Sequence, residues 1–311
     1  MTRLRKSAAP AASLLRRDAQ RVGRRLELVS RRAVAEVSSG RYRSRFKGRG
    51  NVFSEVRAYS PGDEVRTIDW NVTARTGAPH VKVFEEEREL VVWLVVDLSG
   101  STAYGSRHHS KAEAACKVAA CLAQAALSGG DRVGLLTFGE GRQVVVPPRK
   151  GRRQAVAIFE ALAGAEGAAG AQTLAGALQH LLELRRRPAL VFVLSDFDFD
   201  RTAAQLRALA AAARRFDLVP IVLRDRAELQ LPRGGGPVLL EDAESGERLL
   251  LDTSSPAVRA TFESQAQAER ALQEALFRGL RLDAVWLDPE ADGARALARL
   301  MRHRALGRRA P

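Results

Sequence analysis

Long apolar runs alternate with amphipathic stretches over the second two-thirds of the chain. Residues 90–96 and 189–194 are apolar throughout, which is typical of parallel strands buried on both faces. The stretches between such runs place apolar residues at helical spacing. The pattern predicts strands at 90–96, 133–138, 143–146, 190–194, 218–223 and 282–287, and helices at 111–127, 152–162, 174–184, 202–215, 255–278 and 293–303. This alternation predicts a doubly wound α/β domain with a mostly parallel sheet.

The N-terminal third has a different pattern. Residues 11–38 repeat Leu, Val and Ala at spacings of three, four and seven with Arg opposite, which predicts an amphipathic basic helix. Residues 51–87 predict short extended pieces and turns, the plainest turn being at 60–63. Residues 237–251 predict a hairpin. We therefore expect a basic helical segment at 1–39, a β/turn segment at 40–87, and an α/β domain at 88–311 with a hairpin insertion near 226–254.

Charge is concentrated at the two ends of the chain. The net charge is +14, and residues 1–50 hold 15 Lys and Arg against 3 Asp and Glu. Residues 301–311 add four Arg and no acid, so the middle is nearly neutral. Basic ends of this kind suit nucleic acid, an anionic membrane surface or an acidic partner, or they form a solvated face.

The apolar runs and the cysteines bear on location. Every uninterrupted apolar run is far shorter than the ~20 residues that span a bilayer. No apolar stretch follows the basic start, as a secretory signal would require. Cys116 and Cys121 lie on one predicted helix and are too sparse for a disulfide framework. We expect a cytoplasmic protein.

Polar side chains follow the two fully apolar strands. Because the carboxyl ends of parallel strands meet at one edge of a sheet, we expect the side chains at 97–101 and at 196 to lie together. Two carboxylates and three hydroxyls form an all-oxygen set of the kind that Mg²⁺, or Mn²⁺, prefers. The candidate metal ligands are Asp97, Ser99, Ser101, Thr173 and Asp196.

Each candidate also has a purely structural interpretation. Asp97 and the two serines could cap a strand-to-helix turn. Thr173 precedes a predicted helix and is an ordinary N-cap. Asp198 and Asp200 compete with Asp196, which we prefer because it lies nearest the strand end.

These residues carry a resemblance to known domains. Asp-x-Ser-x-Ser after a buried strand, then a Thr, then an Asp after a central strand, resembles the metal-ion-dependent adhesion site of von Willebrand factor A-type domains. Residues 57–70, with the letters RAYSPGDEVRTIDW, and 73–77, TARTG, look like the signature of a prokaryotic group known as domain of unknown function family 58. The likeness spans residues 40–225 and, more loosely, the rest.

The resemblance implies a fold, a site and a kind of partner. It implies a von Willebrand factor A-like domain whose metal is completed by an acidic side chain from a partner protein. It also implies a MoxR-type AAA+ ATPase as partner and a role as adaptor or co-chaperone. Many members of the group have N-terminal membrane segments, and none is readable in this chain.

The signature stretch at 57–77 has a structural interpretation as well. Its arginines stand near acids, and such neighbours usually form structural ion pairs. The alternative is a docking surface beside the metal edge. The residues concerned are Arg57, Arg66, Arg75, Asp63, Glu64 and Asp69.

Other function classes fit the residues less well. Residues 196–200 partly resemble the nucleophile motif of haloacid-dehalogenase-type phosphatases, but the fifth position is Asp. The sequence has neither a P-loop nor a His-Glu-x-x-His pattern. We expect a non-catalytic, Mg²⁺-dependent protein-binding module with no small-molecule substrate. The alternatives are a protein that binds nucleic acid or a membrane surface through residues 1–50 and, less favoured, a metal-dependent phosphohydrolase.

Overall fold

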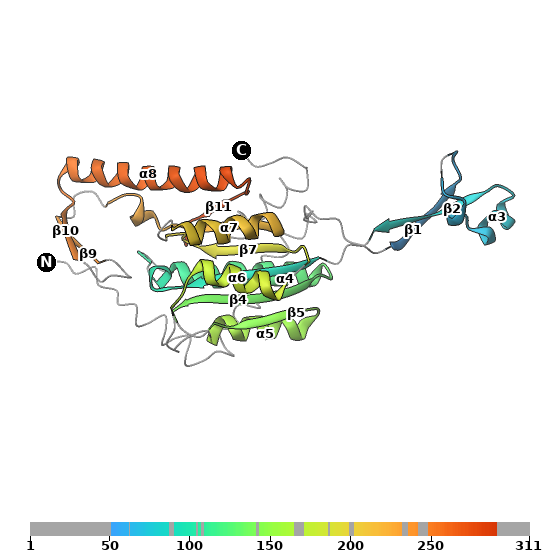
Figure 1. The fold of residues 1–311 in the computed structure, drawn as a ribbon, viewed down its shortest axis with the longest axis horizontal. Coiled ribbons are helices and arrows are strands. Elements are labelled where there is room, and N and C mark those ends of the chain that lie inside the picture. Colours follow the sequence, from blue (N-terminus) through green and yellow to red (C-terminus); the bar gives the residue numbers. More distant parts are fainter. Residues whose placement is uncertain are drawn as a thin grey trace. The chain divides into compact units, whose positions relative to one another are not determined.

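The computed structural model divides the chain into two units, residues 45–90 and the remainder (Figure 1). It describes residues 51–290 except 62, 87–89, 104, 107–108, 141–142, 165–170, 186, 199–201, 232–235 and 242–247. The helices expected at 11–38 and 293–303, and both basic ends, lie outside the described residues.

The smaller unit is built on an antiparallel pair, β1 (Asn51–Ala58) and β2 (His80–Glu86). Between these strands lie η1 (Val65–Thr67) and α3 (Trp70–Thr76). The expectation of only extended pieces and turns was wrong at α3. Asp69 caps that helix by accepting from the amide of Asn71 at 3.0 Å, and Gly77 ends it with a left-handed φ of 74°.

The predicted turn at 60–63 and one predicted ion pair are confirmed. The amide of Asp63 donates to the carbonyl of Ser60 at 3.0 Å. Arg57 holds the Asp63 carboxylate with both guanidinium nitrogens, each at 2.7 Å, and lowers the pKa of that carboxyl. The structural interpretation of the signature stretch therefore holds for Arg57.

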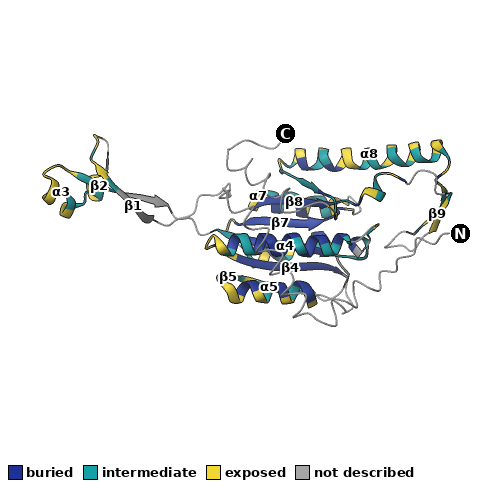
Figure 2. Cartoon of the chain, turned by 180° about the vertical axis from the view of Figure 1, so that it is seen from behind, coloured by how far each residue is buried: buried dark blue, intermediate teal, exposed yellow. Residues whose placement is uncertain are grey.

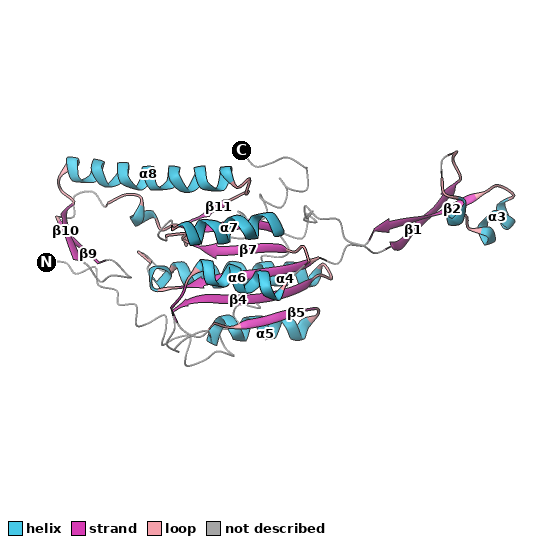
Figure 3. Ribbon diagram, in the orientation of Figure 1, coloured by secondary structure: helices cyan, strands magenta, loops and turns pink. Residues whose placement is uncertain are grey.

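The larger unit contains a seven-stranded sheet in the order β11-β8-β7-β3-β4-β5, with the short β6 paired to β4 (Figure 3). Strands β11, β8, β7, β3 and β4 are parallel, whereas β5 and β6 run antiparallel to β4. The strands are β3 (Val91–Leu98), β4 (Arg132–Glu140), β5 (Val145–Arg149), β6 (Ala171–Gln172), β7 (Leu190–Ser195), β8 (Asp217–Leu223) and β11 (Val285–Leu287). The predicted α/β class and mostly parallel sheet are confirmed.

Helices alternate with these strands close to their predicted places. They are α4 (Lys111–Ser128), α5 (Arg152–Gly164), α6 (Leu174–Leu184), α7 (Ala203–Arg215) and α8 (Pro256–Gly279). Short 3₁₀ turns η2 (Gly100–Ala103) and η3 (Arg226–Glu228) follow β3 and β8, and a hairpin pairs β9 (Pro237–Glu241) with β10 (Arg248–Asp252). Hydroxyl side chains of Ser110, Thr173, Thr202 and Ser255 cap four of the helices.

The core lies on both faces of the sheet. Trp93 and Val95 of β3 point to the face covered by α6 and α7, where Phe277 of α8 joins the same cluster. The alternate residues Val92 and Leu94 are fully buried on the opposite face, where α4 packs against four strands and against α5. Figure 2, seen from behind, shows α4 lying over the buried strands.

The strand order fixes where a ligand site would form. From β3 the chain passes to β4 on one side, and it later returns to β7 on the other side. In open α/β sheets, the crevice at the carboxyl ends of such a divergent pair is where ligands bind. Asp97 lies at the end of β3, and Asp196 directly follows β7. The sheet therefore brings both predicted carboxylates to this crevice.

Candidate metal centre

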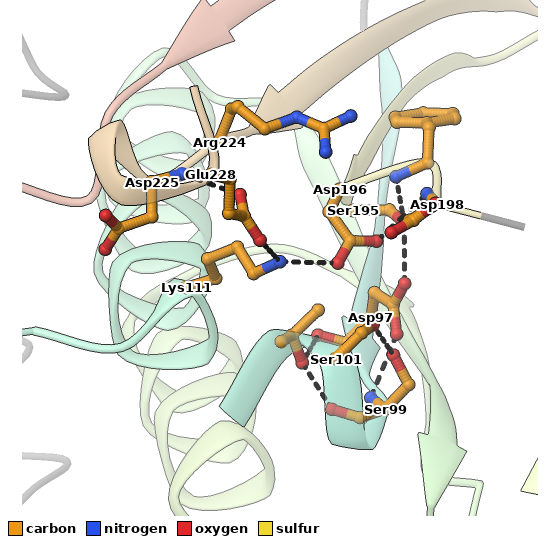
Figure 4. Close-up of polar contacts among 12 residues, drawn as sticks. Asp97, Ser99, Ser101, Lys111, Ser195, Asp196, Asp198, Arg224, Asp225 and Glu228 are labelled. Atoms are coloured by element: carbon orange, nitrogen blue, oxygen red, sulfur yellow. Dashed lines mark hydrogen bonds and ion pairs between the residues drawn. The ribbon is translucent and has the colours of Figure 1, made fainter. Parts of the chain in front are cut away.

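The turn after β3 gathers three of the predicted ligands (Figure 4). The buried Asp97 accepts from the amide of Ser99 at 2.9 Å through Oδ1. The hydroxyls of Ser99 and Ser101 lie 3.0 Å apart and hydrogen-bond to each other. Thr102, fully buried, donates from Oγ1 to the Ser99 carbonyl at 2.8 Å and so closes the turn. The alternating polar residues thus turn their oxygens toward one another.

The end of β4 packs directly against this turn. Gly139 pairs with Leu98 and has a φ of 110°, a conformation that L side chains rarely adopt. A Cβ at this position would lie 2.3 Å from the Ser99 amide nitrogen. Glycine is therefore required for the close approach. Gly139 also pairs with Gln172, which brings the residue before Thr173 to the same edge.

The second oxygen of Asp97 is held from the neighbouring strand. Ser195 donates from Oγ to Asp97 Oδ2 at 2.6 Å and accepts from the amide of Phe197 at 3.0 Å. Burial, followed by repulsion from the Asp196 carboxylate, raises the pKa of Asp97 to about 6, although the bonds from Ser195 and Ser99 oppose the rise. Asp97 is therefore a buried carboxylate that lies close to a second negative charge.

Asp196 has a different set of partners. It is 1% exposed, and its Oδ2 accepts from the ammonium of Lys111 at 2.8 Å. Lys111 also donates to Glu228 Oε1 at 2.6 Å, and the other oxygen of Glu228 accepts from the amide of Asp225 at 2.9 Å. An ion triad from α4, the β7 end and η3 thus borders the crevice (Figure 4).

The backbone after Asp196 is strained and supported from α8. Phe197 is buried with a φ of 53°, an unfavourable conformation for a bulky residue. Gln273 donates from Nε2 to the Phe197 carbonyl at 3.1 Å, and the Phe197 ring meets Phe277 edge-on at 5.1 Å between centroids. These contacts fix the direction in which the Asp196 side chain leaves the strand.

Thr173 and Asp198 differ in their relation to these contacts. Thr173 is exposed, and its hydroxyl accepts from the amide of Gly176 at 3.2 Å, as an N-cap does. Among the described residues, no hydrogen bond joins it to the other four candidates. Asp198 is exposed and contributes its amide to Asp196 Oδ1 at 3.2 Å, whereas Asp200 lies outside the described residues.

The donor chemistry fits a hard divalent cation. Asp97, Ser99 and Ser101 offer convergent oxygens, and the charge repulsion between Asp97 and Asp196 is of the kind that a bound cation relieves. The described part of the chain has no cluster of three His, Cys, Asp or Glu side chains placed to hold a metal. Any ion here would therefore take hydroxyl as well as carboxylate oxygens.

Sequence reasoning missed several residues of this edge. Ser195 directly precedes a predicted ligand, so its position next to the strand end was a usable signal. Lys111 begins an Ala-rich helix, where a lysine is normally solvated, yet it is 1% exposed. Neither Glu228 nor Gln273 belongs to a pattern that marks it, because both reach the site only through the packing of η3 and α8.

The family follows from a direct match. Residues 55–272 match the model of a family described as "Protein of unknown function DUF58". The chain belongs to this family. Uncharacterized proteins of Mycobacterium bovis and Mycobacterium tuberculosis are 35% identical to it over 275 residues, which cover 85% of the chain and 85% of each relative. The resemblance carried by the signature at 57–77 is confirmed.

Solved structures similar to this DUF58 chain share little sequence with it. The conserved hypothetical protein BatB from Bacteroides thetaiotaomicron is 15% identical with a TM-score of 0.44, covering 70% of this chain and 99% of its own. The SpRpn10 VWA domain is 13% identical with a TM-score of 0.38, covering 68% and 95%. The strand order and the strand-end residues, rather than these scores, support the likeness to von Willebrand factor A-type domains.

Two further observations bear on the remaining expectations. None of the helices that the structure describes has the length and apolar character needed to cross a bilayer. A phosphatase nucleophile must present a carboxylate oxygen to its substrate. Asp196 is buried, with Lys111 on one oxygen and the Asp198 amide on the other. Asp196 therefore has one hydrogen-bond partner on each oxygen, and little of it is accessible from solution.

Proposed function

We propose that this DUF58 protein is a non-catalytic protein-binding module whose partner is recognised through Mg²⁺, or Mn²⁺, at the β3–β7 edge. The convergence of Asp97, Ser99 and Ser101 beside Asp196, at the divergence of the sheet, is the observation that carries the proposal. Thr173 is included as a fifth ligand because it directly follows β6, which pairs with Gly139 at the same edge.

The chemistry of the donor set favours binding over catalysis. Asp97, Ser99 and Ser101 would hold the ion, with Asp196 and Thr173 completing its surroundings. When bound, the ion would supply an open coordination position to a carboxylate. Neutral hydroxyls transfer less charge to a cation than carboxylates do, so a further acidic ligand from a partner remains favourable.

The proposed partner is a protein that presents an Asp or Glu. The resemblance to the family further suggests a MoxR-type AAA+ ATPase, with this chain as adaptor or co-chaperone in the maturation of another protein. This part of the proposal rests on analogy with the family and on no residue of the site. A separate contact of residues 1–50 with an anionic surface is compatible with it.

The proposal is tested by affinity capture from native lysate in Mg²⁺ and in EDTA. We expect a protein that wild type retains in Mg²⁺ and that is lost in EDTA or with Asp97→Ala. Asp252→Asn is the matched control, since it removes an exposed carboxylate that bonds to Ser254 and not to the residues of the metal edge. Isothermal titration with Mg²⁺ should show one binding event per chain for wild type and none for Asp97→Ala.

The outcome that contradicts the proposal is equally specific. Capture that is indifferent to EDTA and to Asp97→Ala, but is lost in high salt, would point to polyelectrolyte binding by the basic segment. Hydrolysis of p-nitrophenyl phosphate by wild type and not by Asp196→Asn would instead restore the phosphohydrolase alternative.

A further inference from the structure

Lys111 is an unusual residue for the place that it occupies. It is the first residue of α4, and it is among the largest fully buried side chains of the protein. Its ammonium lies 2.8 Å from Asp196 Oδ2 and 2.6 Å from Glu228 Oε1 (Figure 4). A lysine is rarely buried so deeply unless it is paired. The pairing is therefore a built feature of the crevice.

The pairing places a positive charge beside a predicted metal ligand. Asp196 comes from the end of β7 and Glu228 from η3, and the Lys111 ammonium lies between these two carboxylates. Like charges repel most strongly where water is scarce, so an ammonium at Asp196 opposes a divalent cation at the same edge. The negative charge of Glu228, which also pairs with the ammonium, partly offsets this positive charge.

We infer that Lys111 is a resident cation of the metal edge, which competes with a divalent ion for Asp196 and holds the metal affinity of the site down. Glu228 acts in the opposite sense, because it shares the ammonium. The inference rests on the proposed metal site and adds a mechanism that regulates its occupancy. A site kept weak in this way would depend more strongly on the carboxylate that a partner brings.

A rival role for Lys111 makes the opposite prediction. If the lysine only positions Asp196, its removal would displace a ligand and weaken metal binding. If it is a competing cation, its removal leaves Asp97, Asp196 and Glu228 as an uncompensated acidic set and strengthens metal binding. The direction of the change in affinity therefore decides between the two roles.

The experiment measures the affinity of the full chain for Mn²⁺ alone, by electron paramagnetic resonance of the free ion. Lys111→Gln keeps a hydrogen-bond donor and removes the charge, and we expect it to bind Mn²⁺ at least about tenfold more tightly than wild type. Glu228→Gln leaves the ammonium wholly on Asp196, and we expect it to bind about threefold more weakly. Circular dichroism establishes that each variant is folded.

Each outcome bears on the inference. Unchanged or weaker Mn²⁺ binding by folded Lys111→Gln overturns it, and so does the absence of binding in both this variant and wild type. If Lys111→Gln does not fold, unchanged or tighter binding by folded Glu228→Gln still overturns the inference. If wild type fails to bind Mn²⁺ and Lys111→Gln binds it, the inference stands, while the proposed metal dependence of wild type fails.

Discussion

The two carboxylates at the divergence of the sheet are held in opposite ways. Asp97 takes hydrogen bonds from neutral groups, the Ser99 amide and the Ser195 hydroxyl. Asp196 takes an ion pair from a buried ammonium, that of Lys111. Both side chains are buried, and they come from adjacent parallel strands. The difference therefore lies in what the rest of the fold delivers to each strand end.

This difference separates two roles at one edge. Neutral donors leave the charge of Asp97 uncompensated, which is the electrostatic state that attracts a cation. An ion pair compensates Asp196 and makes it costly to disturb, since the charges it joins are already out of water. The edge combines one carboxylate without a counter-ion with one that is already paired, so an ion would have to compete with Lys111 for Asp196.

The largest effect is expected from removal of the Lys111 ammonium. Lys111→Met leaves the buried Asp196 and the partly buried Glu228 without their counter-charge, and we expect a loss of about 3–5 kcal/mol in the free energy of unfolding. Urea denaturation in EDTA at neutral pH measures the change. Arg207→Met, at an exposed position of α7, is the control and should stay within about 0.5 kcal/mol. A loss below about 1 kcal/mol for Lys111→Met would mean that the ion pair is not structural.

The contrast also shows what could be predicted. The apolar strands and the rule that parallel strands end at one edge located Asp97 and Asp196 without a structure. Lys111 and Glu228 could not be found in this way, because they lie 85 and 32 positions from Asp196 and meet it through the packing of α4 and η3. Long-range contacts of charged side chains have no periodic signature in a sequence.

The helices and strands also divide into those that the sequence predicts and those that it does not. Helices and strands of the larger unit were predictable because each buries a continuous apolar stripe or run. The helix at Trp70–Thr76 was missed, since it has no buried residue and so no apolar periodicity. Its signals were local ones, the cap at Asp69 and the glycine at position 77. No sequence pattern marks Gly139, and its role is explained only by the close approach of the backbone to Ser99.

A smaller effect follows from the raised pKa of Asp97. Between its ordinary pKa of 3.8 and about 6, the unfolded chain has lost a proton that the folded chain still holds. The folded state therefore binds more protons in this window, and stability in EDTA should fall as pH rises through it. We expect a total loss of about 3 kcal/mol, and Asp97→Asn should recover that amount at neutral pH. Thermal and urea denaturation across this pH range measure both.

The control for this prediction is an exposed acid whose pKa is lowered rather than raised. Asp252 is exposed, and hydrogen bonds from Ser254 lower the pKa of its carboxyl. Asp252→Asn should leave the pH dependence between 3.8 and about 6 unchanged and should bring no gain at neutral pH. If Asp97→Asn is instead as stable as wild type or less stable, the carboxylate is not under electrostatic stress and the contrast with Asp196 weakens.

The smallest expected effect concerns Thr173, which is tied to neither carboxylate by a hydrogen bond in the described residues. Its hydroxyl caps α6 at the Gly176 amide. Thr173→Ala should therefore cost about 1 kcal/mol of stability whether or not Thr173 is a ligand. Thr173→Asn retains a capping oxygen, so this variant should be about as stable as wild type.

Metal binding separates the two roles of Thr173. If the hydroxyl contributes to the ion, Thr173→Ala should bind Mn²⁺ more weakly than wild type in titration. A Thr173→Ala protein with wild-type affinity would reduce Thr173 to a helix cap. The metal edge would then consist of the Asp97 turn and the Asp196 ion pair alone.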